Sequence, residues 1–280
     1  MSSAPAARRW GGALNEYPTG NRGPRRMWLV WQYPMFISHP ALQAAGDITD
    51  GPFAWRIYRL ADNANPADLQ CGALGYAHEA KASYQDFLAA RKAGELAQSI
   101  KFQVCLPTPY AVVTVFGRGQ LERGTPPGLQ DLQGELVARM KRLYEAVPQD
   151  VEVGVHLCYG DPDGRHLVEP RDASKEVEFA NAIANAVTRP LTYLHMPMPI
   201  NRFDEEFYRP VADLKLSPKT ELYLGLVHPD GKENMRRRLD LADKYISGYG
   251  IASECGISRA RTRETTMKFL QAYADNSREP

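Results

Sequence analysis

The sequence predicts an α/β protein whose strands and helices form a (β/α)8 barrel of the TIM type, and three observations support this. From about residue 100 onward, short apolar runs alternate regularly with amphipathic helical patterns in about five β-then-α units, which is typical of a parallel sheet. No Gly-rich phosphate loop follows a first strand, as an open dinucleotide-binding sheet would require. Polar residues follow several different strands, where barrel enzymes place their active sites. Because 280 residues suit one such barrel, we expect a single domain over residues 1–280.

Apolar runs predict about seven recognisable strands, so the barrel is expected to be incomplete unless the eighth is hidden near the N-terminus. The predicted strands are 27–31, 55–60, 102–106, 151–158, 191–195, 221–227 and 250–255. Amphipathic periodicity predicts helices over 80–93, 129–147, 174–188, 232–247 and 263–275. Ser174 is the expected N-cap of its helix, and the arginine run 236–238 is expected on a solvated face. Residues 1–25 are expected to form a poorly ordered segment.

The composition is that of an ordinary globular protein, with 44% hydrophobic and 24% charged residues. A net charge of +1 provides no strong field, so we expect a small-molecule substrate and neither nucleic acid nor membrane as a partner. The N-terminus lacks the apolar core of a secretory signal. Four cysteines in a chain of this length do not form a disulfide framework, and they fit a reducing compartment such as the cytoplasm.

The most informative motif is a His-x-Cys pair at the end of a predicted strand. Because side chains at positions i and i+2 of a strand project to the same face, His156 and Cys158 are expected side by side. Cys255 ends a second predicted strand, and one imidazole with two thiols is enough to hold zinc with a coordination position left open. The alternative is that these cysteines are small apolar residues of the core.

Five stretches of the chain resemble the catalytic barrel of cobalamin-independent methionine synthases. The resemblance is closer to a group of synthase-like proteins in the superfamily that also contains uroporphyrinogen decarboxylase. The stretches are FQVCLPTP (102–109), VGVHLCYGD (153–161), YLHMPMP (193–199), LYLGLVHPDG (222–231) and SECGISRART (253–262). The resemblance spans roughly residues 75–275 and implies a TIM barrel and a zinc-dependent methyl transfer of the kind used in methionine biosynthesis.

The same resemblance implies a set of zinc ligands. In the synthases they are a His-x-Cys pair, a Glu at the end of the next strand and a late Cys, so His156, Cys158 and Cys255 take three of the four places. His195 stands where the family has Glu, and it is still a competent zinc ligand, although a core histidine bonded to the backbone is the alternative. The exchange makes the site formally neutral, so a bound thiolate would be a weaker nucleophile.

A second departure from the family concerns the barrel itself. A βα unit that close relatives carry between helix 129–147 and the His-x-Cys strand is missing from this sequence. A barrel that cannot close exposes sheet edges, so association into a homo-oligomer is one expectation.

Other polar residues near strand ends are candidates for the reaction. Asp161 and His228 are the candidate catalytic residues, although a turn residue is the alternative for His228. Tyr159 could position a substrate amine or acid, and Arg202 could clamp a carboxylate, with a solvated loop charge as its alternative.

Three functions are therefore open. The first is a zinc-dependent enzyme that activates a thiol for methyl transfer, with a methylated folate as the candidate donor and Trp28 and Trp31 stacking on its ring, unless they only pack in the core. The second is a metal-free decarboxylase-like enzyme acting on a small acid. The third is a non-catalytic remnant or binding protein.

Overall fold

The computed structural model describes residues 32–48, 55–65, 69–70, 72–108, 111, 132–160, 166, 169–257 and 261–276. The segment 1–25, the predicted strand 27–31, Trp28, Trp31 and Asp161 lie outside the described residues. The chain divides into two compact units, Met1–Gly128 and Leu129–Pro280. The single domain over residues 1–280 stays a prediction.

The first unit contains a short hairpin and two helices. In chain order they are α1 (Tyr33–Ser38), β1 (Leu42–Ile48), β2 (Trp55–Leu60) and α2 (Tyr76–Lys92). β1 and β2 pair antiparallel, with a bulge between Ala44 and Gly46, and Tyr58 stacks on Phe36 at 5.5 Å between ring centroids. The predicted strand 55–60 is confirmed, but it belongs to a hairpin rather than to a parallel sheet. The helix predicted over 80–93 is confirmed and begins earlier, at Tyr76.

The prediction of a strand over 102–106 is wrong. These residues have no regular secondary structure, and the side chains of Val104 and Leu106 are exposed. An apolar run becomes a strand only when a neighbour takes up its backbone hydrogen bonds, and no described strand pairs with this stretch. Phe102 instead packs against Phe87 of α2, with 5.3 Å between ring centroids.

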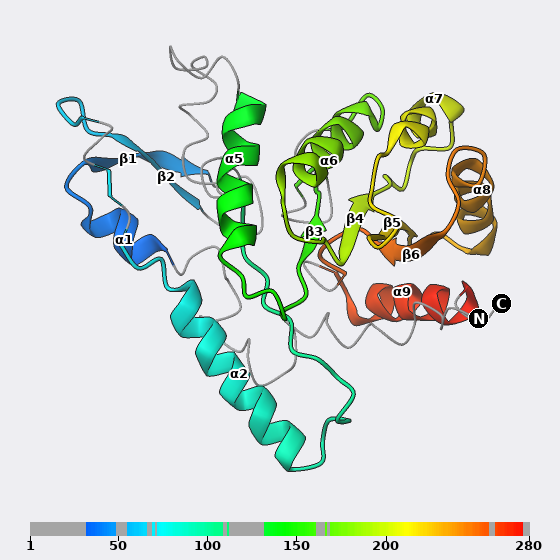
Figure 1. The fold of residues 1–280 in the computed structure, drawn as a ribbon, viewed down its shortest axis with the longest axis horizontal. Helices are drawn as coiled ribbons and strands as arrows, with labels where there is room; N and C mark the ends of the chain where they lie inside the picture. The colour runs from blue at the N-terminus through cyan, green and yellow to red at the C-terminus, as the bar shows by residue number, and fades with distance from the viewer. Residues whose placement is uncertain are drawn as a thin grey trace. The chain divides into compact units, whose positions relative to one another are not determined.

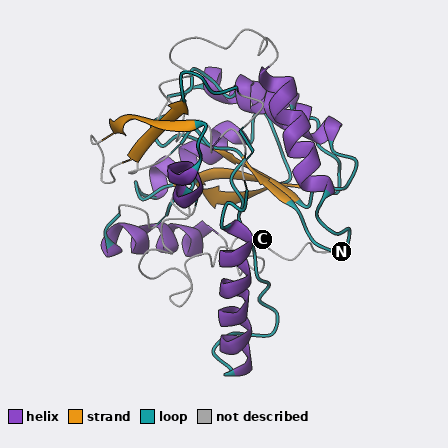
Figure 2. Cartoon of the chain, turned by 90° about the vertical axis from the view of Figure 1, so that its left-hand side faces the viewer, coloured by secondary structure: helices purple, strands orange, loops and turns teal. Residues whose placement is uncertain are grey.

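The second unit is a parallel sheet surrounded by helices (Figure 1). Its elements are α5 (Leu132–Glu145), β3 (Gly154–His156), α6 (Ser174–Ala186), β4 (Tyr193–Pro197), α7 (Glu205–Tyr208), the 3-10 helix η7 (Arg209–Asp213), β5 (Glu221–Val227), α8 (Lys232–Ala242), β6 (Tyr249–Ser253) and α9 (Arg263–Asn276). The strand order in the described sheet is β3-β4-β5-β6, and each neighbouring pair is parallel. In Figure 2 these strands lie between purple helices at the centre of the unit.

The two faces of this sheet are built differently. One face packs into the apolar core, together with residues of α6, α8 and α9. The strand residues buried in this core are Val155, Leu194, Met196, Leu222 and Leu224. The rings of Tyr193 and Tyr223 instead cover two strand glycines, Gly154 and Gly250. A Cβ atom on these glycines would come within 2.1 and 2.6 Å of the rings, so only glycine leaves the rings room to lie against the strand.

The α/β class and the parallel sheet are confirmed, but a closed eight-stranded barrel is not. The described part of the second unit contains four strand-then-helix units, where the sequence predicts about five. The predicted strand 221–227 has the observed bounds, and 191–195 is displaced by two residues to Tyr193–Pro197. The strand predicted over 250–255 ends earlier, at Ser253.

The strand predicted over 151–158 has only three residues in the structure, Gly154–His156. On its N-terminal side, a buried arginine binds the carbonyls of the preceding residues. Arg189 is 5% exposed and donates hydrogen bonds to the carbonyls of Tyr144, Val147 and Val151. These contacts hold residues 147–151 in a turn after α5, and pairing toward the next strand starts at Val153, whose carbonyl accepts a hydrogen bond from the Thr192 amide at 2.8 Å. His156 is therefore the last residue of β3, and Cys158 lies just beyond it.

The predicted helices of this unit are confirmed with small differences at their ends. Ser174 is not the N-cap of α6, because Ala173 occupies that position and Ser174 is the first helical residue. Asp172 provides the local acceptor instead: its Oδ1 accepts a hydrogen bond from the Ser174 amide at 2.9 Å. Among the described residues, no helix has the length and apolarity required to cross a bilayer.

The arginine run 236–238 is not entirely on a solvated face, because Arg238 is completely buried. Its guanidinium donates to the carbonyls of Leu226 and Ile200 at 3.0 and 3.1 Å and to Asp230 Oδ2 at 2.8 Å. The ring of Phe203 lies 5.3 Å from the guanidinium carbon. This ion pair ties the turn after β5 to α8, and every charge-bearing group in it has a partner.

We expect Arg238→Met to destabilise the second unit by about 3 kcal/mol, because it leaves Asp230 beside the core without its counter-ion. Arg236→Met is the matched control, since Arg236 is exposed and forms only a surface ion pair with Asp240. Urea unfolding monitored by circular dichroism measures both changes. Equal losses of unfolding free energy in the two variants would contradict the role assigned to Arg238.

Candidate metal centre

Two histidines meet at the carboxyl edge of the sheet. His156 and His195 are register partners on the parallel strands β3 and β4, so their side chains project from neighbouring positions. Their rings stack with 4.8 Å between centroids, and their Nδ1 atoms are 2.6 Å apart. At that separation one Nδ1 donates a hydrogen bond and the other accepts it, so the two Nδ1 atoms can both act as metal ligands only after the shared proton leaves.

Two cysteines meet at the same edge although their strands are not neighbours. Cys158 follows β3 and Cys255 follows β6, which are the two outermost strands of the described sheet. Strands lie about 4.8 Å apart, so three spacings would separate them by about 14 Å in a flat sheet. Their Sγ atoms are nevertheless 3.2 Å apart. The chain ends after β3 and β6 therefore turn toward each other across the ends of β4 and β5.

These residues form one compact cluster of metal-binding atoms. One ligand atom from each of His156, Cys158 and Cys255 lies within 4.8 Å of the others. Cysteine sulfur and histidine nitrogen are the ligands that zinc prefers, and a tetrahedral site needs only one ligand more. His195, in contact with His156, is placed to provide it or to support His156. The structure thus clusters three of the four predicted ligands and places His195 against one of them, while the binding of a metal by these residues stays a prediction.

The surroundings of His195 favour the neutral form that binds metals. Burial, followed by the nearby His156, lowers the pKa of His195 to about 3, and the backbone of Ser253 only partly offsets this. Its Nε2 is sealed from solvent and has no hydrogen-bond partner of ordinary geometry among the described residues. A neutral imidazole with an unsatisfied nitrogen fits a donor set that awaits a cation.

The hydroxyl of Tyr159 is buried. Both carboxyl oxygens of Glu176 on α6 are buried as well, and neither group has a hydrogen-bond partner of ordinary geometry among the described residues. Burial raises the pKa of Glu176 to about 8, and the hydroxyl of Tyr159 offsets part of that rise. Glu176 is therefore mostly a neutral carboxylic acid at pH 7. The substrate-binding role of Tyr159 stays a prediction.

Sequence reasoning missed a histidine and assigned no role to its partner. His166 Nε2 lies 2.9 Å from Glu254 Oε1, and its Nδ1 lies 3.3 Å from a carboxylate oxygen of Glu169. Glu254 immediately precedes Cys255 in the sequence. His166 lies in a loop without periodicity, so only its type and its place soon after the His-x-Cys pair could have identified it.

Arg202 links the loop before α7 to the residues before α6. Its Nε and Nη2 donate to Asp204 at 2.8 and 2.9 Å, and its Nη1 donates to the carbonyls of Pro170 and Arg171. Asp204 in turn caps α7 by accepting from the Phe207 amide. These bonds occupy four of the five guanidinium N–H groups, so a bidentate grip on a substrate carboxylate would require Arg202 to release one of them. The carboxylate clamp stays a prediction.

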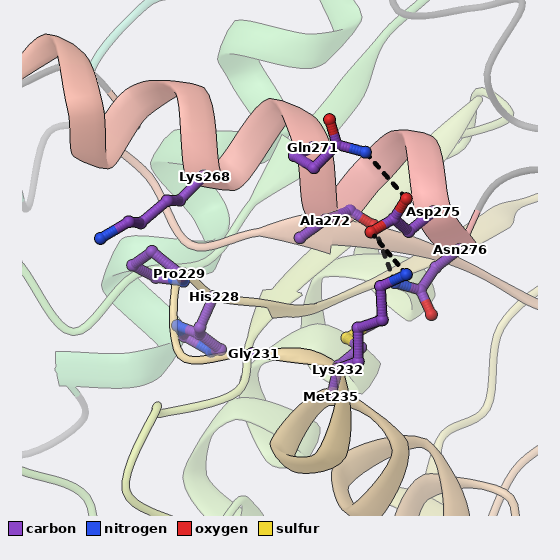
Figure 3. A pocket seen from close by; sticks show the side chains of 10 residues that line it. All are labelled: His228, Pro229, Gly231, Lys232, Met235, Lys268, Gln271, Ala272, Asp275 and Asn276. Atoms are coloured by element: carbon purple, nitrogen blue, oxygen red, sulfur yellow. Dashed lines mark hydrogen bonds and ion pairs between the residues drawn. The ribbon is translucent and has the colours of Figure 1, made fainter.

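His228 is buried at the end of β5, on the wall of a cavity of about 290 Å³ (Figure 3). Its Nε2 donates to the Met198 carbonyl at 2.8 Å, while its Nδ1 lies 3.8 Å from Glu254. Burial lowers the pKa of His228, so the ring is neutral and Nδ1 carries a lone pair. The cavity lies between the turn at Gly231 and helix α9, and Figure 3 shows Lys268 at its rim. None of the four predicted zinc ligands lines it.

Comparisons with known proteins give little support for an assignment. No protein-family model matches the chain, and no curated protein matches it. A solved structure from Listeria monocytogenes, named "Putative Vitamin-B12 Independent Methionine Synthase", aligns with a TM-score of 0.38 and 14% sequence identity. The alignment covers 72% of this chain and 55% of that one, so the chain matches about half the length of that protein. A similarity this low does not establish a shared fold.

The buried acid Glu176 predicts a pH-dependent stability. In the folded protein its pKa of about 8 lies above the ordinary value of 4.5. Between pH 4.5 and pH 8, therefore, Glu176 is protonated in the folded protein but ionised in the unfolded chain. The stabilisation is complete below pH 4.5 and is lost as the pH rises through 8, by up to roughly 5 kcal/mol. Glu176→Gln should flatten this loss in unfolding free energies measured in urea from about pH 5 to about pH 8.5.

Glu178→Gln on the same helix is the control, because Glu178 is exposed beside Lys175 and should leave the slope unchanged. His166 contributes a slope of the same sign, since its pKa is raised to about 9, but it does so equally in both variants. A wild-type slope that persists in Glu176→Gln would show that Glu176 ionises freely in the folded protein.

Proposed function

We propose that this protein is a zinc-dependent enzyme that activates a small thiol for methyl transfer. The observation that carries the proposal is the meeting of His156, Cys158 and Cys255, with ligand atoms within 4.8 Å of one another although two of the strands they follow are the outermost of the sheet. Sheet geometry alone does not require such a meeting. The meeting of these three side chains fits a set of ligands for a thiophilic cation such as zinc.

The residues present would hold zinc through two thiolates and through His156, with His195 as the fourth ligand or as the partner that orients His156. Bound zinc would lower the pKa of a substrate thiol and present its sulfur as a nucleophilic thiolate. With two thiolates and two neutral imidazoles the site has no net charge, which favours thiolate binding but reduces the reactivity of the sulfur. We therefore expect slower alkyl transfer than a Glu-containing site would give.

Two further roles belong to the same proposal. His228 is neutral, and its Nε2 donates a hydrogen bond to the Met198 carbonyl. Its Nδ1 can therefore accept a proton during the reaction. The resemblance to methionine synthases adds a methylated folate as the candidate methyl donor, with Trp28 and Trp31 as its stacking partners and Asp161 as a second catalytic group. These residues lie outside the described part of the chain.

Elemental analysis of the purified protein tests the metal site. We expect about one zinc per chain in the wild type, as for a structural or catalytic site of this donor set, and loss of the metal in Cys158→Ser. Cys105→Ser is the matched control, because Cys105 is an exposed cysteine of the first unit and does not belong to the cluster. It should retain the metal.

A zinc-loaded protein should then methylate small thiols when supplied with a methylated folate, and the Cys158→Ser variant should not. Folded protein that neither contains nor takes up zinc would overturn the methyl-transfer proposal. In that case the cavity beside His228 would be the place to test small carboxylic acids as substrates of a decarboxylase-like enzyme.

A further inference from the structure

The metal-binding cluster joins residues of β3 and the turn after it to Cys255, which follows β6. Hydrogen bonds of the ladder link β3 to β4, β4 to β5 and β5 to β6, but the described sheet has no direct pairing of β3 with β6. Cys158 and Cys255 therefore depend on other contacts to stay within 3.2 Å of each other.

One side-chain pair spans this gap. His166 belongs to the segment between β3 and α6, on the Cys158 side, and Glu254 lies next to Cys255 on the β6 side. The two side chains are 9% and 12% exposed, and His166 Nε2 lies 2.9 Å from Glu254 Oε1. The ring of Tyr159, the residue after Cys158, packs edge-on against the His166 imidazole at 5.3 Å between centroids. The pair thus contacts the direct chain neighbours of both cysteines.

The chemistry of the pair makes it a firm link. The hydrogen bond to Glu254 is the main reason that the pKa of His166 is raised to about 9, with a smaller contribution from Glu169. As an imidazolium, His166 donates from both ring nitrogens, one to each carboxylate. The bond to Glu254 is largely shielded from water, and such charge-assisted hydrogen bonds are stronger than neutral ones at the surface.

We propose that His166 is a positioning residue of the metal site, which acts through Glu254 to hold Cys255 at the correct distance from Cys158 and His156. This inference rests on the proposed function and deepens it, because it names the contact that pre-forms the site. His166 does not touch the metal-binding atoms themselves. It lowers the cost of bringing the second thiolate to the cation, and it should therefore affect metal affinity more than overall stability.

The test compares zinc affinities, measured by competition with a chromophoric chelator. We expect His166→Ala to weaken zinc binding by about 10- to 100-fold, the usual effect of removing a residue that orients a metal ligand. His166→Gln keeps a donor for Glu254 and should recover part of the affinity. His78→Ala is the matched control, because His78 is an exposed histidine of α2 that pairs with Glu79 and lies outside the metal-binding cluster, and it should leave the affinity unchanged.

A spectroscopic readout separates positioning from general destabilisation. Cobalt(II) loaded into the wild type should show a thiolate-to-metal charge-transfer band from two sulfurs, and the band should be weaker or altered in His166→Ala that remains folded by circular dichroism. If His166→Ala does not fold, Glu254→Gln replaces it, because it preserves the shape of the side chain and removes the charge. The double variant His166→Gln/Glu254→Gln should lose less affinity than the two single losses combined.

The outcomes are distinct. Wild-type zinc affinity in folded His166→Ala, or strictly additive losses in the double variant, would overturn the positioning role while leaving the proposed function intact. A wild-type protein that binds no zinc would overturn the metal site, and the positioning role with it.

Discussion

The site depends on one geometric constraint, which is that the carboxyl ends of the outermost strands of a four-stranded parallel sheet meet. β3 and β6 are three strand spacings apart in the described sheet, yet the thiols that follow them lie 3.2 Å from each other. A sheet that twists and curls brings its strand ends together at one edge, and the loops after the strands complete the approach. The cluster of metal-binding atoms and the role proposed for the His166–Glu254 pair both follow from that meeting.

The second unit places charged groups in its interior in two different ways. Arg238 and Arg189 are buried and donate hydrogen bonds to backbone carbonyls, and they fix turns: one after β5 and the other before β3. Near the cluster the charges are shared instead, with His166 between two carboxylates and Glu176 held as a neutral acid. Buried, hydrogen-bonded arginines stabilise a scaffold, whereas titratable groups with raised pKa values are typical of functional sites.

The sequence predicted the part of the site that depends on strand periodicity and on the common edge of parallel strands. His156, Cys158 and Cys255 follow from those two rules, and the structure brings them together. His195 was predicted from the resemblance to methionine synthases, and it lies against His156. The rest depends on tertiary contacts. Glu176 shares the apolar face of α6 with Val177, Ala180 and Ile183, but an acid on that face is ordinarily assigned to solvent. Arg238 looked solvated within a run of three arginines, and the run at 102–106 had no strand to pair with.

The most direct test of this account is X-ray absorption spectroscopy at the zinc edge on the loaded, full-length protein. The account predicts a shell with two sulfur ligands at about 2.3 Å, from the two cysteines, and at least one nitrogen ligand at about 2.0 Å, from His156 alone or with His195. A shell that contains only nitrogen and oxygen would contradict it, because it would place the metal away from the meeting point of β3 and β6.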